Sequence, residues 1–215
     1  MTDHESNQKR LPTALPGFNA IRRFWDPTHL KSVAKIQPGE VYVGNKGEII
    51  STVLGSCISV CMYDSDKGIS GMNHFMLPRG TDETASKDIS SNSTRYGNWA
   101  MEFLINEMIK AGARKEALDV KVFGGGQVLS EMDFMDIGQR NIDFVFSYLV
   151  QEGMPINRHD VGGIYPRKVL FFGDTGRVRV KKLKETRDAN ISSRERSYAK
   201  NISAAPKQGD ITLFD

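Results

Sequence analysis

The chain has 215 residues, of which 39% are hydrophobic and 26% are charged, as expected for a globular protein with a substantial core. No apolar run approaches the ~20 residues of a membrane-spanning helix, and the polar residues 1–10 lack the apolar core of a signal peptide. A net charge of +3 is too small to indicate a nucleic-acid-binding protein. We therefore expect a cytoplasmic protein that does not bind nucleic acid and does not insert into a membrane.

Composition divides the chain into three parts. Residues 1–37 contain three prolines and no sustained hydrophobic period, and we expect them to form an N-terminal extension. The hydrophobic pattern becomes regular over residues 38–184, which we expect to form the folded domain. Residues 185–215 form a polar tail with an apolar cluster at its end. We predict that residues 209–215 dock on the domain, while the polar residues before them form a mobile tether.

Strand patterns predominate in the domain, and two helices lie between them. Period-two alternation and flanking turn residues predict strands at 48–53, 56–63, 69–77, 118–123, 154–164, 167–172 and 177–183. Apolar residues at helical spacing predict helices at 98–111 and 137–152, the second capped by Asp136. The polar residues 79–94 are expected to form a long loop. Because several connections resemble hairpins, we expect an α+β fold with a mostly antiparallel or mixed sheet and helices packed outside.

The chain contains two cysteines, Cys57 and Cys61. Within one strand their Cα atoms would lie ~13 Å apart at ~3.3 Å per residue, whereas a disulfide needs less than ~7 Å. Two free thiols fit a reducing compartment. Cys57 follows Gly55-Ser56 at a predicted bend, where the thiol is presented and nearby N–H groups can stabilise an oxyanion. Cys61 lies in an apolar strand, where a free cysteine usually behaves as a small hydrophobic residue.

A cysteine nucleophile needs a base, and among the four histidines His74 has the best spacing. A hairpin after the Cys57 strand brings His74 back beside that segment, although a histidine satisfied by backbone groups explains the spacing equally well. A third group would fix the tautomer of the imidazole. The hydroxyls of Ser51 and Thr52 are candidates, although threonine is also favoured in strands by propensity alone. Asn73 is less suitable, because adjacent strand residues point to opposite faces.

Other kinds of site have weaker support. Residues 124–126 are three glycines after a predicted strand, but they match neither a phosphate-binding loop nor a dinucleotide fingerprint. We interpret them as a tight bend beside the site. Cys57, Cys61 and His74 lack the paired spacing of a structural zinc site. We therefore expect neither a metal nor a cofactor.

Five short motifs, in this order along the chain, resemble one known family. The motifs are Thr52-Val-Leu-Gly-Ser-Cys57, Gly71-Met-Asn-His74-Phe-Met-Leu-Pro78, Lys121-Val-Phe-Gly-Gly-Gly126, Ile137-Gly-Gln-Arg-Asn141 and Asp160-Val-Gly-Gly163. They are similar to those of the chemoreceptor glutamine deamidases called CheD. The resemblance covers residues 41–182 and implies a fold similar to that of deamidating bacterial toxins. It also implies Cys57 as nucleophile, His74 as base and Thr52, or alternatively Ser51, as the third catalytic member.

The resemblance implies hydrolysis of selected glutamine side chains on chemoreceptors to glutamate, with release of ammonia and without a cofactor. The substrate would be the cytoplasmic helices of the receptor. A CheC-type phosphatase is a further partner of the family, and the sequence leaves open whether one acts here. Two other functions also stay open. One is a cysteine amidase or thioesterase acting on another acyl group, and the other is a non-catalytic adaptor that regulates a signalling partner.

Overall fold

The computed structural model describes residues 11–45, 47–77, 92–128 and 137–183, together with residues 191, 193, 195–198, 201 and 202. The strands are β1 (Arg22–Asp26), β2 (Lys31–Lys35), β3 (Val41–Gly44), β4 (Ile49–Leu54), β5 (Ile58–Asp64), β6 (Ile69–Asn73), β7 (Leu118–Gly124), β8 (Ile156–Val161), β9 (Arg167–Phe172) and β10 (Val178–Lys182). The helices are α1 (Asn92–Lys110), the 3-10 turn η2 (Lys115–Ala117) and α2 (Ile137–Gln151). None of the helices in these described ranges is long and apolar enough to cross a membrane.

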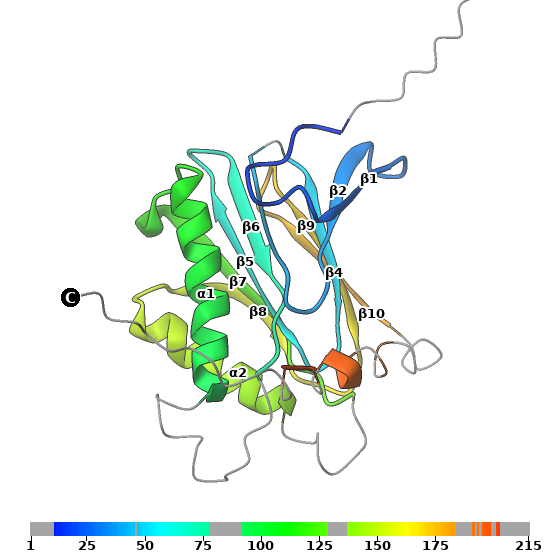
Figure 1. The fold of residues 1–215 in the computed structure, drawn as a ribbon, viewed down its shortest axis with the longest axis vertical. Helices are drawn as coiled ribbons and strands as arrows, with labels where there is room; N and C mark the ends of the chain where they lie inside the picture. Colours follow the sequence, from blue (N-terminus) through cyan, green and yellow to red (C-terminus); the bar gives the residue numbers. More distant parts are fainter. Residues whose placement is uncertain are drawn as a thin grey trace, which may run out of the picture.

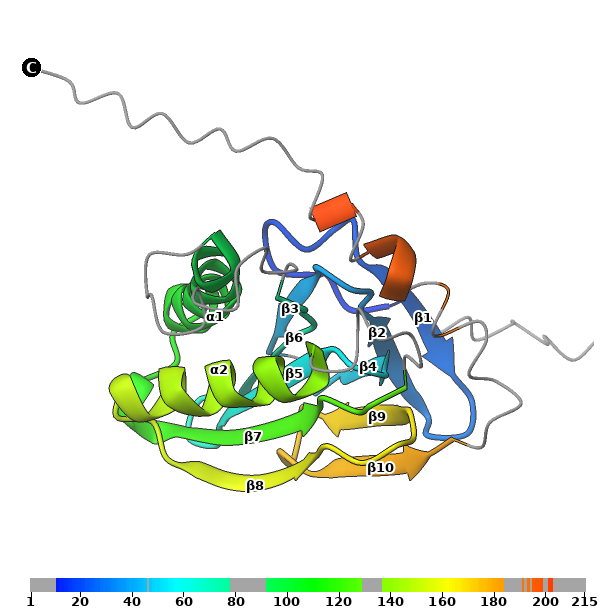
Figure 2. The ribbon, with the colours of Figure 1, turned by 90° about the horizontal axis from the view of Figure 1, so that it is seen from below.

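The described strands form two five-stranded sheets. The order is β1-β2-β4-β9-β10 in the first sheet and β3-β6-β5-β7-β8 in the second. Most neighbours are antiparallel, but β2 with β4 and β7 with β8 are parallel pairs. Helix α1 packs on β6 and β3, and α2 packs on β5, so both helices cover the second sheet from outside (Figures 1 and 2). The predicted α+β class, with mixed sheets and outer helices, is confirmed.

Two strands come from the segment that the sequence pattern assigned to an N-terminal extension. β1 pairs with β2, and β2 pairs in parallel with β4 through Val33, Ala34 and Lys35. Val33, Ala34 and Ile36 are buried, so this segment contributes to the core. The pattern missed β2 because its three central residues are short or small and lysines flank them. The folded part of the chain therefore begins well before residue 38.

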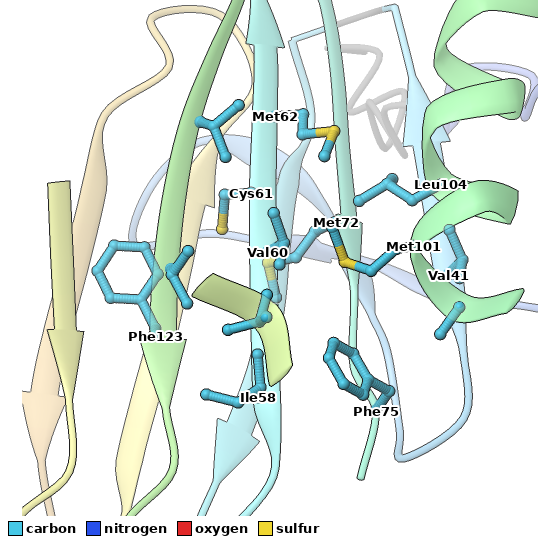
Figure 3. Packing of buried hydrophobic residues seen from close by; sticks show 14 of the residues in the cluster. Val41, Ile58, Val60, Cys61, Met62, Met72, Phe75, Met101, Leu104 and Phe123 are labelled. Atoms are coloured by element: carbon cyan, nitrogen blue, oxygen red, sulfur yellow. The ribbon is translucent and has the colours of Figure 1, made fainter. Parts of the chain in front are cut away.

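The core is centred on β5, the middle strand of the second sheet. Figure 3 shows Ile58, Val60 and Cys61 of this strand among the buried side chains of the core, which include Met72 of β6 and Met101 of α1. Each of these five side chains is fully buried, which is worth ~1.5–3 kcal/mol for a large aliphatic side chain. Cys61 thus behaves as a small hydrophobic residue, as its strand position predicted. Both cysteines carry free thiols.

The helices differ from their predicted bounds mainly at one end. α1 begins at Asn92, inside the segment predicted as a loop, while residues 78–91 and the predicted cap Asp136 lie outside the described residues. The predicted apolar stripe of α1 is buried at Met101, Leu104, Ile105 and Met108, but Ile109 is exposed.

Candidate active site

Residues 55–57 join the two sheets, because β4 ends at Leu54 in the first and β5 begins at Ile58 in the second. A chain that changes sheets at this point leaves its N–H and C=O groups outside the strand ladders. The three carbonyl groups are satisfied from the interior. Gly126 N donates to Gly55 O at 2.7 Å, Gly125 N donates to Cys57 O at 2.8 Å, and Asn141 Nδ2 donates to Ser56 O at 2.7 Å.

The glycine run at 124–126 is the bend that its sequence predicted. Gly124 and Gly125 have φ of 113° and 66°, which favour glycine. A Cβ on Gly124 would lie 2.1 Å from the carbonyl oxygen of Cys57. The run therefore holds the Cys57 loop by close backbone contact.

Asn141 is a second anchor of this loop, and the sequence pattern assigned it no role. It is fully buried on α2, donates to Ser56 O and accepts a 2.8 Å hydrogen bond from Leu77 N. It lies four residues after Ile137 and four before Val145, on the buried face of the helix. A polar residue at such a position was the available signal, since a buried amide needs specific partners.

His74 lies where the predicted hairpin would bring it. It follows β6, its N–H donates to Glu40 O at 2.9 Å, and its carbonyl accepts from Gly39 N at 2.7 Å. The next residue, Phe75, forms an antiparallel bridge with Ile58, which adjoins Cys57. The Cys57 loop and His74 are thus adjacent because β5 and β6 are neighbouring strands.

Thr52 fixes the tautomer of His74. The Thr52 hydroxyl donates to Ile36 O at 2.9 Å and lies 2.8 Å from His74 Nδ1. A hydroxyl has one proton, so Thr52 Oγ1 accepts the proton of Nδ1, and Nε2 is left unprotonated as an acceptor. His74 Nε2 is buried without a hydrogen-bond partner. A free basic nitrogen beside a thiol is the arrangement that a nucleophilic cysteine requires.

The alternatives for the third group lie elsewhere. Asn73 faces α1, since its Oδ1 accepts from Val60 N at 2.8 Å and its Nδ2 donates to Ala100 O at 3.2 Å. Ser51 takes part in the described structure through its carbonyl, which accepts from Ile36 N at 3.0 Å. Of the two hydroxyl candidates, the structure brings Thr52 to the imidazole.

Glu195, which the sequence pattern did not single out, completes the site. Its Oε1 accepts from Gly55 N at 2.8 Å and from Cys57 N at 3.3 Å. Its Oε2 accepts from Ser56 N at 2.8 Å and from Ser56 Oγ at 2.7 Å. Three successive backbone N–H groups therefore converge on one carboxylate, as they would on an oxyanion. The nearest of these donors is 138 residues away in the sequence, and no local pattern reveals such a contact.

Cys57 is fully buried, which corrects the expectation that its thiol is presented to solvent. Burial raises the pKa of the thiol well above its usual value, and the charge of Glu195 raises it further. Burial also lowers the pKa of His74 from 6.5 to about 3. With Glu195 in place, the resting pair is therefore a neutral thiol beside a neutral imidazole.

Cys57 Sγ, a ring nitrogen of His74 and a carboxylate oxygen of Glu195 all lie within 4.8 Å of one another, a grouping small enough for a metal ion. The backbone donors argue for a different occupant. Both oxygens of Glu195 already accept N–H hydrogen bonds, and three N–H dipoles aimed at one point favour an anion over a cation. We therefore interpret the cluster as a candidate anion-binding site.

The Asp160-Val-Gly-Gly163 motif supports the fold near the site. The fully buried Arg167 donates to Asp160 Oδ1 through Nε and Nη2, at 3.0 and 2.9 Å, and to Gly162 O through Nη2 at 2.5 Å. The acceptors of these Arg167 hydrogen bonds all lie within 7 residues of it in the sequence. Asp160, Gly162 and Arg167 therefore form a local structural cluster.

Comparisons with known proteins agree with the motifs. Residues 76–182 match the family model described as CheD chemotactic sensory transduction. Three relatives, each described as a probable chemoreceptor glutamine deamidase CheD, are similar over nearly their whole length. The protein of Saccharophagus degradans is 47% identical over 95% of this chain and 95% of its own. The protein of Halorhodospira halophila is 48% identical over 95% and 94%, and that of Hahella chejuensis 45% identical over 100% of both. The chain therefore belongs to the CheD family.

Proposed function

We propose that this protein is a cysteine hydrolase that converts glutamine side chains on the cytoplasmic helices of chemoreceptors to glutamate, releasing ammonia. One observation carries the chemistry: His74, which Thr52 orients and whose Nε2 has no hydrogen-bond partner, lies beside Cys57 and a cluster of convergent N–H donors. The substrate class is supported by the names of relatives that are 45–48% identical.

The proposed reaction has two steps. Cys57 Sγ transfers its proton to His74 Nε2 and attacks the amide carbon, while the N–H groups of residues 55–57 hold the oxygen that becomes negative. The C–N bond then breaks, and the imidazolium gives its proton to the departing ammonia. In the second step His74 takes a proton from water, the hydroxide attacks the thioester, and the thiol is released. Thr52 keeps Nδ1 protonated throughout, so that Nε2 carries the moving proton.

The test is intact-mass analysis of a purified receptor cytoplasmic fragment after incubation with the enzyme. Each deamidated glutamine adds about 1 Da, and Cys57→Ala should abolish the gain because no acyl-enzyme can form. A non-catalytic adaptor would retain its effect in Cys57→Ala, and an amidase for another substrate would leave the receptor mass unchanged. Either result contradicts the proposal.

The proposed function also implies a cellular compartment and a second binding partner. Because the receptor helices lie in the cytoplasm, we place the protein there as well. A CheC-type phosphatase is proposed as a second binding partner on the family resemblance. Co-elution of the two purified proteins as one complex in size-exclusion chromatography tests this, and separate elution at micromolar concentrations would contradict it.

A further inference from the structure

The C-terminal segment lies on the candidate active site. Its described residues between 191 and 202 are helical, and Figures 1 and 2 show the segment at the end of the molecule where β4 meets the Cys57 loop. Burial follows helical spacing: Ile191 and Glu195 are buried, Tyr198 and Ile202 are half-buried, and Ser193, Ser197 and Asn201 are exposed. This is the pattern of an amphipathic helix lying in a groove. It corrects the expectation that this part of the tail is a mobile tether, while residues 209–215 lie outside the described residues.

Two further side chains hold the segment on either side of Glu195. Ile191, four residues earlier, is 6% exposed. Tyr198, three residues later, hydrogen-bonds through its hydroxyl to that of Tyr96 on α1 and packs against Gly39. A Cβ on Gly39 would lie 2.9 Å from the Tyr198 hydroxyl, so a larger residue there would have to displace the Tyr198 ring. Residues at these spacings share one face of a helix with Glu195.

The chemistry of Glu195 matches the product of the proposed reaction, a glutamate side chain on a helix. We propose that the segment carrying Glu195 is a built-in product mimic, with Glu195 in the position of the receptor side chain, and that this segment and the receptor helix compete for one groove. The inference rests on the proposed function. It assigns the N–H donors of residues 55–57 to the substrate carbonyl oxygen. It also predicts that the groove binds a receptor helix with apolar residues four positions before and three positions after the glutamine.

The surroundings of His74 support mutually exclusive binding. A cavity of about 20 Å³, roughly the space of one water molecule, is lined by Thr52 and His74 together with Ile191 and Glu195. Cys57 is fully buried while this segment is seated, and the carboxylate of Glu195 occupies the N–H groups of residues 55–57 that the substrate oxygen would need. The charge of Glu195 also raises the pKa of Cys57, which opposes thiolate formation until the segment leaves.

A decisive experiment turns the mimic into a substrate. In the full-length Glu195→Gln variant, Cys57 should attack Cδ of residue 195, ammonia should leave, and water should hydrolyse the thioester to give glutamate. Peptide mapping by mass spectrometry follows the conversion. It should be first order and independent of protein concentration, because the reacting groups belong to one molecule.

Three controls accompany this variant. Glu195→Gln combined with Cys57→Ala should keep its glutamine. Glu116→Gln, an exposed residue on the 3-10 turn η2, should also keep its glutamine. The same Glu195→Gln preparation is given the receptor fragment. If it deamidates the receptor but leaves residue 195 unchanged, the product-mimic proposal is wrong and the proposed function stands. If neither site is converted, the proposed function fails, and this inference fails with it.

Competition is measured separately with Glu195→Ala and its control Ser197→Ala on the exposed face of the segment. Losing one charge-assisted hydrogen bond shifts an equilibrium by about tenfold or more. Glu195→Ala should therefore lower KM for the receptor fragment by at least ~10-fold, and Ser197→Ala should leave KM unchanged. The variant should also speed alkylation of Cys57 by iodoacetamide, with Cys61 still unreactive. An unchanged KM together with unchanged alkylation would show that the segment does not guard the site.

Discussion

Replacing Thr52 by valine is the sharpest test of how His74 is oriented. Valine keeps the volume and the β-branched shape of threonine but removes the hydroxyl. The side chain is 1% exposed, so water cannot readily take its place. Two hydrogen bonds disappear at once: the 2.9 Å bond to Ile36 O and the 2.8 Å bond with His74 Nδ1. Ile36 O and Nδ1 then lose buried partners.

The magnitudes follow from those two losses. A buried polar group without a partner costs about 1–3 kcal/mol, so losing the partners of two such groups should lower the free energy of unfolding by about 2–6 kcal/mol. The imidazole also loses the acceptor that keeps its proton on Nδ1. If that preference is worth about 1.4–2.8 kcal/mol, kcat/KM should fall about 10–100-fold. This is less than the loss expected for Cys57→Ala, which removes the nucleophile itself.

The assay combines receptor deamidation by intact mass with thermal unfolding. Thr52→Ser keeps the hydroxyl and should retain most of the turnover, which separates the loss of the hydrogen bond from the loss of a methyl group. Ser51→Ala is the matched control on the neighbouring residue of β4, and it should leave kcat/KM nearly unchanged. Full turnover in Thr52→Val, or a larger loss in Ser51→Ala, would refute the assignment of the third member.

Further predictions concern the loop anchors and the imidazole. Gly124→Ala should abolish turnover and cost about 2–4 kcal/mol of stability, since its Cβ would lie 2.1 Å from Cys57 O. Gly68→Ala, with φ of 63° and nothing within 4 Å, should cost only about 1 kcal/mol when both variants are compared by thermal unfolding. Asn141→Leu should lower kcat and change KM less, because it removes the hydrogen bond to the Ser56 carbonyl in the Cys57 loop without touching the groove. An unchanged kcat would contradict this. His74 takes up a proton near pH 6.5 when unfolded but near pH 3 when folded, so unfolding free energy should fall as pH drops through that range. His74→Gln should flatten this slope, and an equal slope in both proteins would show that the histidine is not buried as described.

Local patterns predicted the parts of the site that short-range contacts assemble. The pairing of Cys57 with His74 follows from a hairpin between neighbouring strands, and hairpins can be predicted from hydrophobic alternation and turn residues. The choice between Ser51 and Thr52 was not legible, because adjacent residues of β4 point to opposite faces and the sequence does not say which face meets His74. That choice depends on how two sheets are placed together. Their catalytic roles stay predictions until the variants are measured.

Long-range contacts account for what the sequence did not reveal. The parallel pairing of β2 with β4 needs no turn signal, and lysines at both ends of β2 hide its buried centre. Glu195 reaches the site from a polar, charged segment that resembled a tether. The available signal was the helical spacing of Ile191, Tyr198 and Ile202 around it, which is weak because only three apolar residues carry it.

The construction of the anion site explains why backbone anchors matter more there than side chains. Residues 55–57 lie between two sheets, so no strand ladder uses their N–H groups. Their carbonyl oxygens are all bound from the interior, by the glycine run at 124–126 and by Asn141. Because these carbonyl groups all point inward, the three N–H groups point the other way, into the site, where they donate to Glu195. Substitutions of the side chains around the anion site leave these N–H donors in place. A change in the glycine run or at Asn141 lets the peptide planes of residues 55–57 rotate, so that the N–H groups no longer point into the site. Turnover should therefore be more sensitive to substitutions at residues 124–126 and at Asn141 than the distance of these residues from the reacting atoms suggests.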